Sequence, residues 1–177
     1  MESTAATIPV STTSMGLRCG LLIGLLSVLV SFVAYTMQWQ DSWAVRIVSL
    51  VISIGGIAFA QREFKLRNAG YMSYGEGIGV GVVAACVMGA ISAIFIYFYL
   101  SIIAPEMIAQ LLEKARQGME AKNSLSDEQI DQAMAMTSKF MKPPFMAGST
   151  LVGSIIFGLI ISLITSAFIK NAKPEFE

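Results

Sequence analysis

Few side chains in this sequence are of the types that catalyse reactions or bind metal ions. The 177 residues include no histidine and only two cysteines, Cys19 and Cys86. Histidine is the commonest general base and a common zinc ligand, so its absence excludes Ser/His and Cys/His nucleophile pairs and the usual zinc sites. Both cysteines stand within apolar stretches, where a free cysteine behaves as a small hydrophobic residue. We therefore expect no enzyme, no metal site and no bound cofactor.

Three ionisable residues lie in or beside long apolar segments. A charge within the hydrocarbon of a membrane costs free energy, so such residues are candidates for a function. They are Arg18, Arg46 and Glu76. Arg18 and Glu76 are expected at one end of their helices, where they could pair or reach the lipid headgroups separately. Arg46 is expected at the opposite end, within reach of Asp41, Glu106 or a lipid phosphate. Interfacial anchoring is the simpler interpretation, and a proton-coupled or anion-binding role is the alternative.

The composition is that of an integral membrane protein. Hydrophobic residues make up 55% of the chain and charged residues 14%, and the mean hydropathy is +0.67. The 12 basic and 12 acidic residues balance, so no excess of charge indicates a nucleic acid as partner. The first partner of this chain is therefore the lipid bilayer.

Four apolar segments are long enough to cross a membrane as helices, which requires about 20 residues each. The predicted fold is all-α, a polytopic membrane protein that forms one membrane domain over 1–177, with a disordered tail at 1–14. The predicted spans are 17–37, 44–60, 76–104 and 145–169. The second is the shortest, and it ends where a hydrophilic connection is predicted to begin at Gln61.

The connections between these spans indicate an orientation. Four spans put both termini and the 61–73 connection on the same side, and that connection carries Arg62, Lys65 and Arg67. The 38–43 turn on the other side has no basic residue and two tryptophans, which favour the bilayer interface. Because basic residues in short loops favour the cytoplasmic side, both termini are predicted to be cytoplasmic.

The only long hydrophilic segment, 105–144, is predicted to form two amphipathic helices. Pro105 is placed to start the first helix or to kink the helix before it. Ser126 and Gln129 form a capping-box pattern for the second helix, which Pro143 and Pro144 are predicted to terminate. Apolar residues recur at helical spacing in both helices: Ile108, Leu111, Leu112, Ala115 and Met119, then Ile130, Ala133, Met134, Thr137 and Met141. Such stripes favour a helical hairpin that stands outside the membrane.

Small residues recur at every fourth position in three of the spans. The sets are Gly16, Gly20 and Gly24; Gly77, Gly81, Ala85, Gly89 and Ala93; and Ser154, Gly158, Ser162 and Ser166. In lipid, small residues let helix backbones approach closely, so helix packing is the first interpretation. A substrate path along a face without bulky side chains is the alternative.

Methionine is abundant, with six of the 11 methionines between Met107 and Met146. Thioethers can bind Cu(I), and Met134, Met136 and Met141 would be the residues to do so. Flexible methionines more often serve packing or contacts with a partner, which is the interpretation we favour.

Several stretches together resemble a known family. They are Tyr74-Gly75-Glu76-Gly77, Pro105-Glu106 with the following Leu111-Leu112-Glu113-Lys114, and Ser126-Asp127-Glu128-Gln129-Ile130 leading to Phe140-Met141. Over nearly its whole length the chain resembles the small bacterial membrane proteins of domain-of-unknown-function family 4199. The resemblance implies a four-span inner-membrane protein with a helical extracytoplasmic insertion, and it implies no activity or cofactor.

Two functional hypotheses follow. The first is an interaction, accessory or scaffold protein, whose hairpin and small-residue faces contact a membrane or envelope protein. The second is a small oligomeric carrier or lipid-handling protein, a homo-oligomer with a path along the glycine face. Polar substitutions at Leu111, Leu112, Ile130 or Met134 test the first, whereas Gly81→Leu or Glu76→Gln tests the second.

Overall fold

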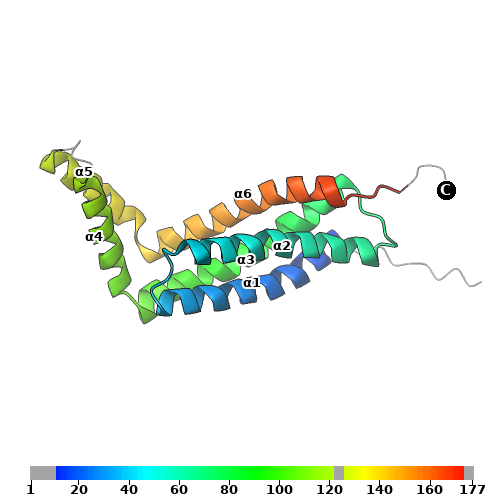
Figure 1. Ribbon diagram of the computed structural model, residues 1–177, viewed down its shortest axis with the longest axis horizontal. Coiled ribbons are helices and arrows are strands. Elements are labelled where there is room, and N and C mark those ends of the chain that lie inside the picture. The colour runs from blue at the N-terminus through cyan, green and yellow to red at the C-terminus, as the bar shows by residue number, and fades with distance from the viewer. Residues whose placement is uncertain (1–10, 122–125, 174–177) are drawn as a thin grey trace, which may run out of the picture. The chain divides into compact units, whose positions relative to one another are not determined.

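The computed structural model describes residues 11–121 and 126–173 and is helical almost throughout (Figure 1). The expected disordered tail therefore lies largely outside the described residues, and α1 already begins at Thr12. The helices are α1 (Thr12–Thr36), α2 (Trp43–Arg67), α3 (Tyr74–Phe98), the π-helical turn η1 (Tyr99–Ile103), α4 (Glu106–Glu120), α5 (Asp127–Phe140) and α6 (Pro143–Ile169). The all-α prediction is confirmed.

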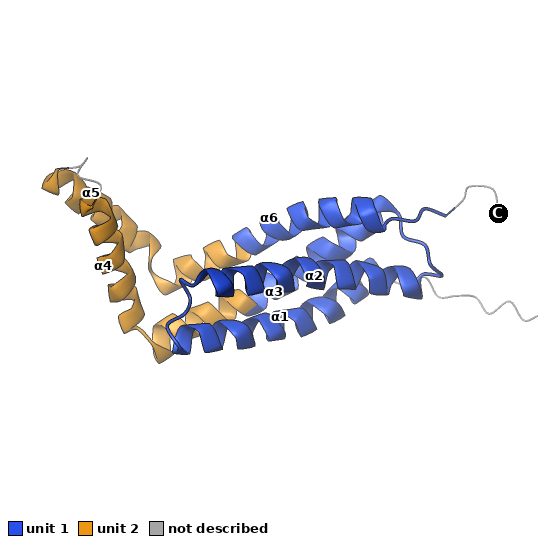
Figure 2. Cartoon of the chain, in the orientation of Figure 1, with its two compact units in different colours: residues 1–91, 153–177 blue, residues 92–152 orange. Residues whose placement is uncertain are grey.

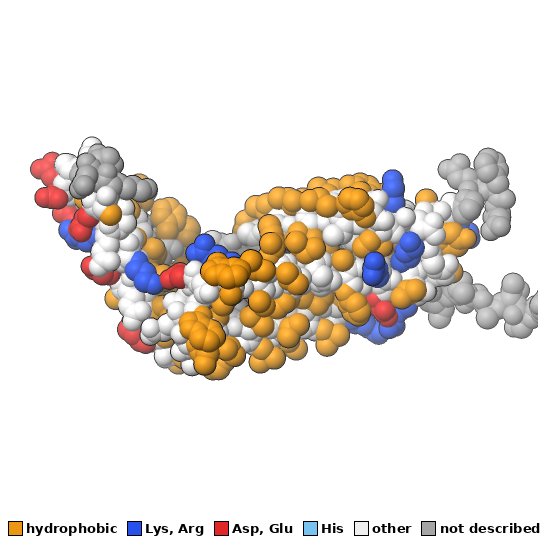
Figure 3. All heavy atoms as spheres, in the orientation of Figure 1, with side chains coloured by type: hydrophobic (Ala, Val, Ile, Leu, Met, Phe, Trp, Pro, Cys, Tyr) orange, Lys and Arg blue, Asp and Glu red, His pale blue; other side chains and the backbone are white. Residues whose placement is uncertain are grey.

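Four of these helices are long and apolar enough to cross a membrane. They are α1, α2, α3 continued through η1, and α6, with 25 to 30 residues each. At 1.5 Å per residue, even 25 residues extend about 37 Å, which exceeds the hydrocarbon core. Hydrophobic side chains cover much of the visible surface of these helices (Figure 3). Exposing such a large apolar surface to water is unfavourable, so the chain is a polytopic membrane protein.

The second span is longer than its predicted range of 44–60. The α2 helix continues through Arg67, and the connection to α3 is reduced to residues 68–73. The polar residues after Ala60 ended the apolar run, but Ile57, Gln61 and Phe64 keep helical spacing and are all buried. The backbone then reverses at Ala69 and Gly70, which have φ values of 53° and 83°.

The two prolines separate the second amphipathic helix from the fourth span. The α5 helix ends at Phe140, before the prolines as predicted, and Pro143 is also the first residue of α6. Proline lacks a backbone N–H and has a fixed φ near −65°, which suits the first turn of a helix. The fourth span therefore begins two residues before the predicted Phe145.

Pro105 marks the boundary between the third span and the first amphipathic helix. The helix that begins as α3 widens into the π-helical turn η1 and is interrupted at Ala104, which has φ −141° and ψ 62°. Pro105 follows as the N-cap residue of α4. Of the two predicted roles, starting the new helix is therefore the one observed.

The chain forms two compact units (Figure 2). Unit 1 comprises residues 1–91 and 153–177, and in it α1, α2 and the larger parts of α3 and α6 lie side by side. Its core contains Ile57, Phe64, Met72 and Val80, each no more than 1% exposed.

Unit 2 comprises residues 92–152: the end of α3, η1, α4, α5 and the start of α6. Within this unit, α4 and α5 pack against each other. Met107 of α4 and Ile130 of α5 are buried, and the apolar residues around them are half-buried. The predicted helical hairpin is therefore present, and its two stripes face each other.

Candidate functional site

The glycine stripe of α1 forms a close contact with α3. A Cβ atom at Gly16 would lie 2.7 Å from the Cβ of Val83, and one at Gly20 would lie 2.8 Å from the carbonyl oxygen of Ala84. At Gly24 the nearest atom would be Cδ1 of Ile91, at 2.8 Å. Real Cβ atoms are not found this close to a backbone or Cβ atom, so Gly16 and Gly20 require glycine, whereas at Gly24 the flexible end of Ile91 would have to move. The stripe packs helices within this chain.

The stripe of α3 contacts α6 in the same way. A Cβ atom at Gly77 would lie 2.6 Å from Oγ of Ser166, and one at Gly81 would collide with the side chain of Ser162. The Ser162 hydroxyl donates a hydrogen bond of 2.6 Å to the carbonyl of Gly158, so it is fixed within its own helix. These contacts support the packing interpretation of the small residues.

The same face continues at Gly158, whose added Cβ atom would collide with Cβ of Ala85. Ile57 of α2 is 1% exposed and lies near both Gly81 and Gly158. Gly89 is also buried, one turn further along α3. Side chains thus occupy the face along which a substrate path was the alternative interpretation.

A buried polar cluster joins α2, α3 and α6. The side chain of Gln61 is fully buried, and its Nε2 donates to the carbonyl of Gly77 at 3.1 Å and to Oγ of Ser166 at 3.0 Å. The Gln61 Oε1 atom has no hydrogen-bond partner among the described protein groups. Gln61 was assigned to a connection on hydropathy alone. Its spacing from Ile57 and Phe64 was the signal that could have placed it in the core.

Glu76 caps its own helix. Its Oε2 accepts hydrogen bonds from the backbone N–H of Ser73 at 2.7 Å and from the Ser73 hydroxyl at 2.8 Å. The Ser73 hydroxyl in turn accepts from the Glu76 N–H at 3.3 Å. This is the reciprocal arrangement of a capping box, which satisfies two N–H groups at the start of α3.

Arg18 is exposed, and the ion pairs of the described residues include none between it and Glu76. The register of the helices gives the reason. Gly16, two residues before Arg18, lies against Val80 and Val83, one to two turns into α3 from Glu76. Of the two predicted arrangements, Arg18 and Glu76 therefore adopt the separate one.

The connection between α2 and α3 is tied to the end of α6. Met72 and Asn171 exchange two backbone hydrogen bonds of 2.8 Å, and the Asn171 side chain donates to the carbonyl of Gly70 at 2.9 Å. The ammonium of Lys65 donates to the carbonyl of Ile169 at 2.9 Å. The bond from Lys65 satisfies a carbonyl group that the end of α6 leaves without a helical partner.

Arg46 lines a groove of about 420 Å³ between α1 and α2, closed on one side by Phe157 of α6. The other polar residues of the lining are Ser31, Tyr35, Gln40, Ser49 and Ser53. A second groove of about 440 Å³, also between α1 and α2, is lined by apolar residues, among them Leu29, Val33 and Trp39. The first groove combines a cation with hydroxyl groups, the donors that an anionic headgroup would need.

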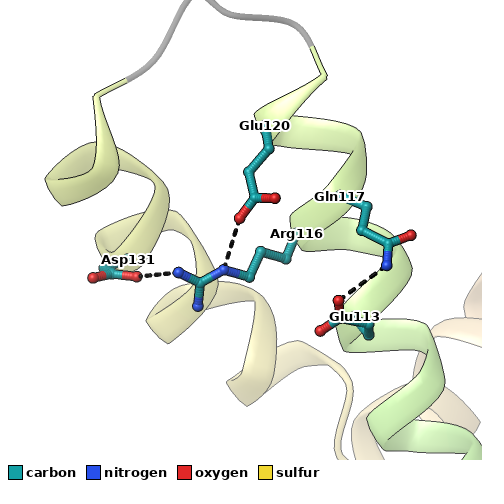
Figure 4. Close-up of polar contacts among 5 residues, drawn as sticks. All are labelled: Glu113, Arg116, Gln117, Glu120 and Asp131. Carbon is teal, nitrogen blue, oxygen red and sulfur yellow. Dashed lines mark hydrogen bonds and ion pairs between the residues drawn. The ribbon is translucent and has the colours of Figure 1, made fainter.

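Charged side chains in the hairpin bind one another (Figure 4). Arg116 of α4 contacts Glu120 at 3.0 Å on its own helix and Asp131 of α5 at 3.3 Å. The hydrogen bond to Glu120 and the negative charge of Asp131 raise the pKa of Arg116. These groups are solvent-exposed, where ion pairs orient helices more than they stabilise them.

The structure offers no metal site of the usual ligands: no three His, Cys, Asp or Glu side chains cluster among the described residues. The methionines considered for Cu(I) do not share a surface. Met134 is half-buried in the stripe that faces α4, whereas Met136 is 64% exposed, about half a turn away on α5.

Comparison with known proteins gives a family but no activity. A family model described as a protein of unknown function, DUF4199, matches residues 18–171. No curated protein and no solved structure matches the chain. The match begins within α1 and continues through α2, α3, both helices of the hairpin and α6.

Proposed function

The chain belongs to the DUF4199 family, and from that premise we propose a non-catalytic interaction or accessory protein of the bacterial inner membrane. The hairpin of α4 and α5 is its binding element. The packing of the hairpin carries this proposal, because a pair of helices that stabilises itself can present a fixed surface to another protein.

Three features show that the hairpin is an ordered element. Ile130 is 4% exposed between the helices, Arg116 bridges to Asp131, and a complete capping box of Ser126 and Gln129 starts α5. The segment is therefore a formed element of structure. A mere linker between two spans would not need these contacts.

The hairpin also has apolar side chains that its own packing does not use. Met136 is 64% exposed and Phe140 is 52% exposed, one helical turn apart on α5. Phe140 also meets the ring of Phe145 edge to face, with centroids 4.8 Å apart. Adjacent exposed apolar side chains are typical of protein contact sites, and Met and Phe are enriched in them.

The proposed orientation puts both termini in the cytoplasm and the hairpin on the opposite side. Its support is the charge of the short connections. The 61–73 connection carries three basic side chains and one acidic side chain, whereas the 38–43 turn carries one acidic and no basic side chain. Basic residues close to the ends of spans favour the cytoplasmic side.

A second candidate function is a small oligomeric carrier or lipid-handling protein. The Arg46 groove is the observation that favours it, because the groove is polar and lies between membrane-spanning helices. The glycine face gives this candidate no support, since Ser162 and Ile57 fill it. Its critical residue is therefore Arg46, and Gly81 contributes only packing.

The test is purification of the tagged full-length protein after crosslinking in cells, with its co-purifying proteins identified by mass spectrometry. The informative variant is Met136→Glu with Phe140→Glu. Ala135→Glu is the matched control, because Ala135 is an exposed residue on another face of α5. We expect a stoichiometric second protein with the wild type and the control, and its loss from the double variant.

A partner that survives the double substitution would contradict the proposed surface. A clean homo-oligomer without any second protein would contradict the interaction function and favour the carrier. In that case, Arg46→Gln should reduce flux or lipid transfer. Substitutions at Leu111, Leu112, Ile130 or Met134 are less suitable, because these residues pack the hairpin itself.

A further inference from the structure

A small basic cavity lies where α2 and α6 end. It has a volume of about 360 Å³ and is lined by Arg62, Lys65, Leu66, Phe168 and Ile169. Two cations therefore stand beside two large apolar side chains at the end of membrane-spanning helices. Lys and Arg side chains are visible in this part of unit 1 in Figure 3.

The two cations retain capacity to bind an anion. The ammonium of Lys65 has three donors, of which one is directed to the carbonyl of Ile169 at 2.9 Å. That bond fixes the ammonium at the wall of the cavity. Arg62 is exposed and presents a planar guanidinium with five donors, a shape that fits two oxygens of a phosphate.

The neighbouring carboxylates are engaged elsewhere. Glu63 pairs with Arg67 at 2.7 Å, on the same helix. Glu76 accepts two hydrogen bonds from Ser73. Neither lines the cavity. The anion that would complement Arg62 and Lys65 is thus not one of these nearby side chains.

The apolar part of the cavity determines which anion fits. Leu66 is 74% exposed and Phe168 is 86% exposed, so both face the surroundings of the helices. An inorganic anion would leave these side chains without contact. A phospholipid would place its phosphate on the cations and an acyl chain along Leu66 and Phe168. Basic cavities between spans commonly bind anionic headgroups.

We propose that this cavity binds one anionic phospholipid, with its phosphate held by Arg62 and Lys65 and its acyl chain against Leu66 and Phe168. The site is distinct from the hairpin, so the proposal stands independently of the interaction function. It also differs from the Arg46 groove, which lies near the start of α2.

The test is lipid binding by the full-length protein in a neutral detergent, measured by native mass spectrometry. Dioleoyl phosphatidylglycerol is compared with dioleoyl phosphatidylcholine, which has the same acyl chains and no net charge. We expect tighter binding of phosphatidylglycerol and a decrease of about fivefold in its affinity for Arg62→Gln, as the loss of one cation near a lipid phosphate predicts.

Lys173→Gln is the matched control, since it removes one positive charge from the same end of unit 1 but outside the cavity. It should bind phosphatidylglycerol like the wild type, whereas Phe168→Ala should weaken both lipids. Because Arg62 and Phe168 are exposed, both variants should fold.

Three results would overturn the proposal. Unchanged binding by Arg62→Gln would show that this cation does not bind the phosphate. Equal losses in Arg62→Gln and Lys173→Gln would show attraction by the overall charge of this end. Displacement of the lipid by excess inorganic phosphate, without an effect of Phe168→Ala, would identify a site for a free anion.

Discussion

Unit 1 and the α4–α5 hairpin are both built from packed helices, but only unit 1 uses glycines at the contacts between its helices. In unit 1, the glycines of α1 lie against Val83, Ala84 and Ile91 of α3, and the glycines of α3 lie against serines of α6. In the hairpin, Met107 and Ile130 are buried, and larger apolar residues surround them. The two regions therefore obtain stability in different ways.

The solvent of each region explains the difference. Lipid is as apolar as leucine, so burying a large apolar side chain between two spans gains little. Close backbone approach and interhelical hydrogen bonds, such as those of Gln61, hold spans together instead. In water, burial of apolar area is itself the main driving force, and the hairpin uses it. The comparison predicts opposite responses to substitution in the two regions.

The largest effect is expected from enlarging a small residue in unit 1. Gly81→Leu adds a side chain where even a Cβ atom would collide with Ser162 and lie 3.1 Å from Cγ2 of Ile57. We expect a loss of at least about 3 kcal/mol, the upper end for overpacking. Thermal unfolding in detergent, followed by size-exclusion chromatography, measures it.

Gly153→Leu is the matched control for Gly81→Leu. Gly153 lies in α6, and a Cβ atom there would meet nothing within 4 Å. This variant should unfold like the wild type. If both variants unfolded alike, close contact would not be what holds these spans together.

A smaller effect is expected from shortening a large residue in the hairpin. Ile130→Ala removes apolar volume from a side chain that is 4% exposed, which should cost about 2 kcal/mol. Amide hydrogen exchange should then increase in α4 and α5 and remain unchanged in α1 to α3. Met136→Ala, at an exposed position of the same helix, should leave exchange unchanged. Faster exchange throughout the chain would refute independent stabilisation of the hairpin.

The smallest effect is expected at the buried amide. Gln61→Leu keeps most of the side-chain volume but removes the hydrogen bonds to Gly77 and Ser166. Interhelical hydrogen bonds in membranes contribute about 0.6 kcal/mol on average, so the variant should fold and lose little stability. A double-mutant cycle with Ser166→Ala measures the coupling of the pair. Zero coupling would show that the Gln61–Ser166 hydrogen bond does not contribute to the free energy of unfolding.

Much of the architecture could be predicted from the sequence. Long apolar segments gave the four spans, the capping-box pattern at Ser126 gave the start of α5, and helical spacing gave the two stripes of the hairpin. These features are local, because each depends on residues within a few turns of the same helix. The errors also have local causes. Hydropathy ended the second span at Ala60, and it started the fourth span at Phe145, two residues after its observed start at Pro143.

The sequence by itself determined that this chain is helical and membrane-embedded, and which residues are small enough for close contact between helices. Only the tertiary structure decided which helices use those contacts. It also separated Arg18 from Glu76, placed Gln61 in a buried cluster and brought Arg62 and Lys65 beside Phe168. The reason is that composition and hydrophobic periodicity are properties of a single helix. The alignment of one helix against another depends instead on how well their surfaces fit, and those surfaces are far apart in the chain.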